Sequence, residues 1–187
     1  MCQWQWQLCI SQRGSFDNNQ HNNVSARDGG KVELRGCQCV GSKSWSGLAV
    51  FHSNSFAMAT GCDISSNQHN NIAAQCGGRV ELRDCQGNSS KGHCGMYVSE
   101  CNSSAKAVAC CFCDNQHNNV NAQKGGKMEL DSCQCDSSKG HCALGVFDSS
   151  TSAIAGSCSF CSNKQANVVA RRGACVELCD SKCDESK

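Results

Sequence analysis

Three histidines recur in the 187-residue sequence, each inside the motif Asn-Gln-His-Asn-Asn. They are His21, His69 and His117, and each follows the previous one by 48 residues. Imidazole nitrogens bind zinc at about 2.0–2.1 Å, so the motif first suggests a metal site. If the copies belong to alternate layers of stacked strands, they lie roughly 9.6 Å apart and cannot share one ion. We therefore expect exposed corner residues rather than ligands.

Twenty cysteines supply the second candidate chemistry. Cys110 and Cys113, and again Cys158 and Cys161, have the spacing of zinc knuckles, and Cys133 between them leaves metal binding open as an alternative. A column of buried, reduced, structural thiols is the favoured interpretation, because parallel stacking aims neighbouring thiols poorly for disulfides. The column consists of Cys37, Cys62, Cys85, Cys110, Cys133 and Cys158.

Two further patterns suggest catalysis. The Lys-Gly-His-Cys sequence at 91–94 and 139–142 places a histidine beside a thiol, but adjacent residues rarely reach the geometry of nucleophile and base. Glu33, Glu81 and Glu129 form a regular column, which is typical of a solvated strand face and has no distinguished carboxylate pair. We assign no catalytic residue, metal ligand or cofactor, and an enzyme is the less favoured interpretation.

The elements that carry these residues follow from the repeat. Apolar residues alternate over three to five positions, as in Val32/Leu34 and Ala57/Ala59, and Gly, Ser and Asn interrupt them, which predicts short strands. The column cysteines fall alternately 25 and 23 residues apart, so each 48-residue repeat holds two coils of about 24 residues. The sequence predicts an all-β solenoid of about seven coils with parallel strands.

The recurring Gly-Gly-x-Val-Glu-Leu-x-x-Cys, followed by Ala-x-Ala-x-x-Cys-x-Phe, resembles the right-handed parallel β-helix repeat. That repeat occurs in pectate-lyase-like proteins, in the NosD family and in F-box proteins with a β-helix domain. The resemblance covers about residues 15 to 180 and implies a right-handed parallel β-helix. It implies little about chemistry, because these families share a scaffold and differ in activity.

The repeat also predicts the domain organisation. We expect an N-terminal strand or cap at 1–14 in which Trp4 and Trp6 close the core, a β-helix at 15–179 and a charged tail at 180–187. The C-terminal end looks under-capped, which suggests self-association or a protein partner there. A ladder of corner asparagines should hydrogen-bond between coils; its members are Asn19, Asn67, Asn115 and Asn163.

Composition narrows the function. A net charge of +1 gives no basic stripe for nucleic acid, and no apolar run is long enough for membrane insertion. Without a secretory leader in the sequence, we expect an intracellular, soluble protein with mostly reduced thiols. The predicted function is a non-catalytic scaffold or protein-interaction module; the alternative is a carbohydrate-binding or carbohydrate-active β-helix. The expected interaction surface consists of Trp4, Trp6, Trp45, Glu33, Glu81 and Glu129.

Overall fold

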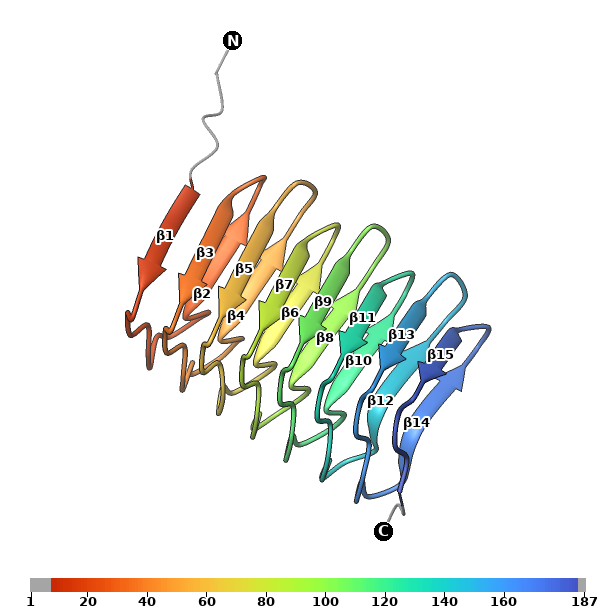
Figure 1. The fold of residues 1–187 in the computed structure, drawn as a ribbon. Helices are drawn as coiled ribbons and strands as arrows, with labels where there is room; N and C mark the ends of the chain where they lie inside the picture. Colours follow the sequence, from red (N-terminus) through yellow and green to blue (C-terminus); the bar gives the residue numbers. More distant parts are fainter. Residues whose placement is uncertain (1–7, 185–187) are drawn as a thin grey trace.

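The chain forms a parallel β-solenoid whose coils stack along one axis (Figure 1). The computed structural model describes residues 8–184. Fifteen strands and no helix occur in that range, so nothing within it has the form of a membrane-crossing helix. The coils number about seven and recur about every 24 residues, which confirms the predicted all-β parallel architecture.

Two parallel sheets form the long walls of the solenoid. The eight-stranded sheet contains β1 (Leu8–Gln12), β3 (Lys31–Arg35), β5 (Phe56–Thr60), β7 (Arg79–Arg83), β9 (Ser104–Val108), β11 (Lys127–Asp131), β13 (Ser152–Gly156) and β15 (Cys175–Cys179). The seven-stranded sheet contains β2 (Val24–Arg27), β4 (Leu48–Phe51), β6 (Ile72–Gln75), β8 (Met96–Ser99), β10 (Val120–Gln123), β12 (Cys142–Phe147) and β14 (Ala166–Arg171).

A third, narrow wall joins the two sheets along one side. It consists of single-residue parallel bridges that run from Ser15 to Gln38, Asp63, Gln86, Cys111, Gln134, Ser159 and Lys182. Each bridge is flanked by inter-coil backbone hydrogen bonds, such as Phe112 N–H to the Gln134 carbonyl at 2.8 Å. The backbone of every coil is therefore tied to its neighbours on three sides.

Two alternating turn types explain why the sequence repeats every 48 residues although the coil has about 24. Three-residue turns at 28–30, 76–78, 124–126 and 172–174 alternate with four-residue turns at 52–55, 100–103 and 148–151. The shorter turns contain Gly29, Gly77, Gly125 and Gly173, all with φ between 81° and 87°. Such a backbone favours glycine, because a Cβ would be strained there. The longer turns brace the shorter ones: the Ser55 hydroxyl, for example, accepts a hydrogen bond from Gly29 N–H at 2.9 Å.

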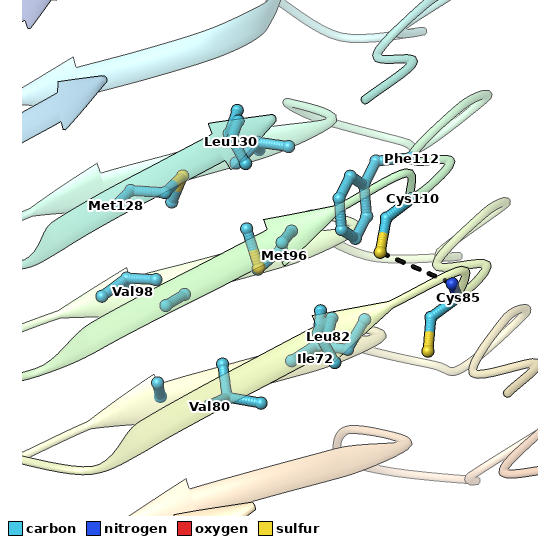
Figure 2. Close-up of a cluster of buried hydrophobic side chains, with 14 of the residues drawn as sticks. Ile72, Val80, Leu82, Cys85, Met96, Val98, Cys110, Phe112, Met128 and Leu130 are labelled. Atoms are coloured by element: carbon cyan, nitrogen blue, oxygen red, sulfur yellow. Dashed lines mark hydrogen bonds between the residues drawn. The ribbon is translucent and has the colours of Figure 1, made fainter. Parts of the chain in front are cut away.

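The core is built from small and medium side chains that alternate with outward ones along each strand. In Figure 2, Val80 and Leu82 of β7 and Met128 and Leu130 of β11 lie between the walls, and Phe112 packs against them from the third wall. All five are buried. Because every coil covers the next, alanine and cysteine can fill many of the remaining core positions.

The ladder of parallel strands and bridges reaches close to both ends of the described residues. β1 pairs in register with β3, so the ladder begins before residue 15; Trp4 and Trp6 lie outside the described residues. Lys182 bridges Ser159, so the ladder also continues into the segment predicted as a charged tail. Backbone pairing extends at both ends because it does not depend on side-chain type. At the C-terminal edge Leu178 of β15 is 41% exposed.

Candidate functional site

A ladder of thiols runs along the inner side of the third wall. The backbone N–H of four of its cysteines donates to the Sγ of the next coil. Three of these bonds follow one another: Cys37 to Cys62 at 3.4 Å, Cys62 to Cys85 at 3.5 Å and Cys85 to Cys110 at 3.5 Å. Cys133 donates to Cys158 in the same way, at 3.4 Å. The thiols of the column are buried, and the four that accept satisfy backbone N–H groups that would otherwise be orphaned. Thiols of the column also donate to carbonyl oxygens, as Cys133 does to those of Ala107 and Asp131.

The corner asparagines hydrogen-bond between coils. Asn67, Asn115 and Asn163 are fully buried, and each Oδ1 accepts from the backbone N–H of a serine one coil away, at 2.8–2.9 Å. Each Oδ1 also accepts from the Nδ2 of an asparagine 44 residues earlier, at 3.0–3.2 Å. One amide group thus connects three successive coils.

Asn19 differs from the other three members of the predicted ladder. It is exposed, although its side chain donates to the Asn23 Oδ1 at 3.2 Å as the other three donate to the asparagine four residues on. The reason is positional, because no described residue lies one coil before it. Asn23 makes the inter-coil bond of its own column, because it donates to the Asn67 Oδ1 at 3.0 Å as Asn71 and Asn119 donate to Asn115 and Asn163.

The histidines form one continuous column at the corner. His69, His93, His117 and His141 follow one another at 24-residue steps, and their ring centroids lie 4.1, 5.1 and 5.7 Å apart. The Asn-Gln-His-Asn-Asn and Lys-Gly-His-Cys motifs therefore supply alternate members of one column. This column was not predicted, because the two motifs were considered separately. Trp45 is the preceding rung and is 52% exposed. A shared offset of 24 residues was the available signal.

Partial burial affects the titration of the inner rungs. Desolvation lowers the pKa of His69, and desolvation followed by the charges of His69 and His117 lowers the pKa of His93. Stacked neutral imidazoles are thereby favoured over stacked cations. Among residues 8–184 no group of three or more His, Cys, Asp or Glu side chains is arranged to hold a metal ion.

The two cysteines of each zinc-knuckle-like pair lie on opposite sides of the third wall. Cys110 and Cys158 belong to the buried ladder, whereas Cys113 and Cys161 lie on the outer side and are partly exposed. Burial raises the pKa of Cys94 and of Cys142 to about 12, so neither supplies a thiolate nucleophile at neutral pH. The Cys142 Sγ instead donates a hydrogen bond to the Asn118 Oδ1 at 3.3 Å, within the buried corner.

The glutamate column lies on the outer face of the eight-stranded sheet. We call this surface the lateral face; strand register places Ile10, Glu33, Met58, Glu81, Lys106, Glu129, Ile154 and Glu177 in one row along it. Met58 separates Glu33 from Glu81, and Lys106 separates Glu81 from Glu129. These three glutamates instead form ion pairs with basic side chains: Glu33 with Arg35, Glu81 with Arg79, and Glu129 with Lys106. This row contains no carboxylate pair of the glycosidase kind.

A ridge with a hollow on each side marks the middle of the lateral face. The ridge consists of Lys106, Glu129 and Ile154, with Lys106 Nζ 3.1 Å from Glu129 Oε2 and Ile154 48% exposed. The larger hollow, about 480 Å³, is lined on its outer rim by Arg79, Ser104, Lys127 and Ser152. The smaller, about 340 Å³, lies toward Asp131 and Gly156. Short side chains beside long ones create both hollows.

No protein-family model matches the chain, and no curated protein matches it.

Proposed function

We propose that the chain is a non-catalytic β-solenoid module that binds a protein partner through the ridge and hollows of the lateral face. The observation that carries this proposal is the combination of an exposed Ile154, an exposed ion pair and two hollows on a hydrogen-bonded sheet. Such a surface is preorganised, so a partner binds it without ordering loops first. A contiguous apolar surface with a polar rim marks an interaction site, and Ile154 here adjoins hollows that Val80, Met128 and Leu130 also line.

The charges of the larger hollow indicate what the partner presents. Arg79, Lys106 and Lys127 line it together with a single acid, Glu129. The basic excess favours an acidic side chain of the partner in this hollow, beside an apolar side chain that packs on Ile154. The rigid row of strands would then act as a scaffold for that contact.

A second candidate, glycan binding, is favoured by one specific observation on the same sheet. A hollow of about 590 Å³ contains Phe56, with the Arg79 guanidinium 5.8 Å from its ring centroid, and is also lined by Asn54, Asn102 and Glu81. An aromatic face beside amide and charged groups suits a sugar ring. We rank it second because Arg79 already occupies the ring face.

The test is affinity capture from the native source with the full chain, followed by mass spectrometry. We expect the double variant Lys106→Glu and Ile154→Arg to lose a specific protein that wild type captures. Lys139→Glu is the control for the lysine substitution, since it makes the same Lys→Glu change at an exposed position of the histidine corner. An unchanged set of captured proteins in the double variant contradicts the proposal. A specific glycan-array signal that Phe56→Ala abolishes would favour the second candidate instead.

A further inference from the structure

Cys111 and Cys113 form a pair of neighbouring thiols on the outer side of the third wall. Their Sγ atoms lie 3.3 Å apart, and both residues are partly exposed. Phe112 between them is fully buried in the core, so the alternation of the chain sends both thiols outward.

The backbone around the pair is held on both sides. Cys111 N–H donates to the Cys85 carbonyl at 2.9 Å, Phe112 N–H to the Gln134 carbonyl at 2.8 Å, and Cys113 N–H to the Asn88 Oδ1 at 2.7 Å. The fold therefore holds the backbone under both thiols in place and keeps them on the same side of the wall.

This pair is particular to one coil. The bridge register places Gln86 and Asn88 in the same two positions one coil earlier, and Gln134 and Asp136 one coil later. In the ladder inside the wall, by contrast, each thiol is buried. Neither burial nor the repeat pattern accounts for two facing thiols at the surface.

We propose that Cys111 and Cys113 are a redox-active dithiol that exchanges with low-molecular-weight disulfides such as glutathione disulfide. The Cys111 thiolate attacks one sulfur of glutathione disulfide, forms a mixed disulfide and releases one glutathione thiolate. The Cys113 sulfur then attacks the Cys111 sulfur and releases the second glutathione, while its proton passes to the released thiolate. Two protein thiols are oxidised to one disulfide, and one glutathione disulfide is reduced to two thiols.

The electrostatics of the pair suit these roles. The hydrogen bond between the two thiols lowers the pKa of the Cys111 thiol to about 7, against the raising effects of burial and of the Asp136 and Asp114 charges. The same hydrogen bond raises the pKa of Cys113. Cys111 is therefore the attacking thiol near neutral pH and Cys113 the resolving one. The partly exposed position leaves the resulting disulfide open to reduction by glutathione, so the exchange is reversible.

The experiment treats the full chain with glutathione buffers of varied thiol-to-disulfide ratio, quenches with acid and an alkylating agent, and maps cysteines by fragment-resolved mass spectrometry. We expect a disulfide between Cys111 and Cys113, with loss of two hydrogen atoms, that disappears when reduced glutathione is added back. Cys113→Ser should stop at the mixed disulfide on Cys111. Cys111→Ser should slow glutathione release roughly tenfold or more, because it removes the low-pKa thiolate.

Cys161→Ser is the control, since it removes a partly exposed thiol from the same wall two coils away and should leave the reaction unchanged. Circular dichroism of each variant checks that the β-structure is retained. The proposal is overturned if wild type shows no disulfide, if Cys110 is the oxidised partner, or if the mixed disulfide persists in wild type.

Discussion

The Asn71 side chain donates from its Nδ2 to the Oδ1 of Asn115 at 3.2 Å, across the coil that lies between them. That intermediate coil contributes the Ser90 N–H, which donates to the same oxygen at 2.9 Å. It also contributes Gly95, where a Cβ would lie 2.6 Å from the Asn115 Nδ2. Alternate coils therefore provide amide side chains and the space to receive them. This complementarity is a second reason for a two-coil repeat.

Asn115→Ala should destabilise the solenoid by roughly 2–4 kcal/mol. The change leaves the Ser90 N–H and the Asn71 amide without their shared acceptor inside the protein, and an orphaned buried polar group costs about 1–3 kcal/mol. Asn19→Ala is the matched control at the exposed copy of the position, with an expected change within about 0.5 kcal/mol. Urea unfolding of both variants measures the difference; equal losses would contradict the bridging role of Asn115.

Gly77→Ala should cost roughly 2–3 kcal/mol. Gly77 has φ 87°, and a Cβ there would lie 2.9 Å from the Ser53 Oγ and 3.2 Å from its Cα, so backbone strain and crowding add. Gly61→Ala tests strain alone, because its φ is 61°, no atom lies within 4 Å, and Ala109 has a φ of 53° at the equivalent position. Its expected cost is about 1 kcal/mol or less. Thermal unfolding of the pair should rank them in this order.

Cys110→Ala should lower the free energy of unfolding by about 1–3 kcal/mol, since the buried Cys85 N–H loses its acceptor. Cys110→Ser should lose less. The same column ends in Ser181, whose hydroxyl accepts from Cys158 N–H at 3.1 Å, so a hydroxyl fits this role. Chemical denaturation of the two variants under reducing conditions provides the measurement. A serine variant no more stable than the alanine variant would show that packing of sulfur, not hydrogen bonding, dominates.

Stability should fall as the pH decreases from 7 to 5. Desolvation lowers the pKa of His69 and His93 in the folded state below the unfolded value of about 6.5. Above that pH the rings are neutral in both states and full stability is present. Below it the unfolded chain binds protons first, so the folded state loses stability until its own imidazoles titrate.

His93→Gln should weaken this pH dependence, because it removes one of the two imidazoles with a lowered pKa. Glutamine is chosen because it already follows the column at Gln165, whose Oε1 lies 3.1 Å from the His141 Nδ1. His21→Gln, at an exposed corner before Trp45, serves as the control. The midpoint of thermal unfolding, recorded at pH 5, 6 and 7, supplies the comparison. An identical decrease in wild type and His93→Gln would exclude the stacked column as its source.

Much of the fold could be predicted because a solenoid makes each residue's neighbour a fixed number of positions away. Period-two alternation predicted the strands, and the Cys37 and Cys62 spacing predicted the coil. The candidate surface was only partly predictable. Glu129 was identified, whereas the hollows beside it depend on the short Ser104 and Ser152 next to long Arg79 and Lys127. The hollows therefore depend on differences in side-chain length between neighbouring strands, which the hydrophobic pattern of the sequence does not show.

The sequence alone therefore determined the period, the parallel stacking and the columns, because all three follow from repetition along the chain. The tertiary structure decided which columns meet. It brought two separate histidine motifs into one stack and left Asn19 exposed while Asn67, Asn115 and Asn163 were buried. It also placed Cys111 against Cys113 while Cys110 was buried. The physical reason is that inward or outward orientation depends on how each turn and bridge is closed by the neighbouring coils.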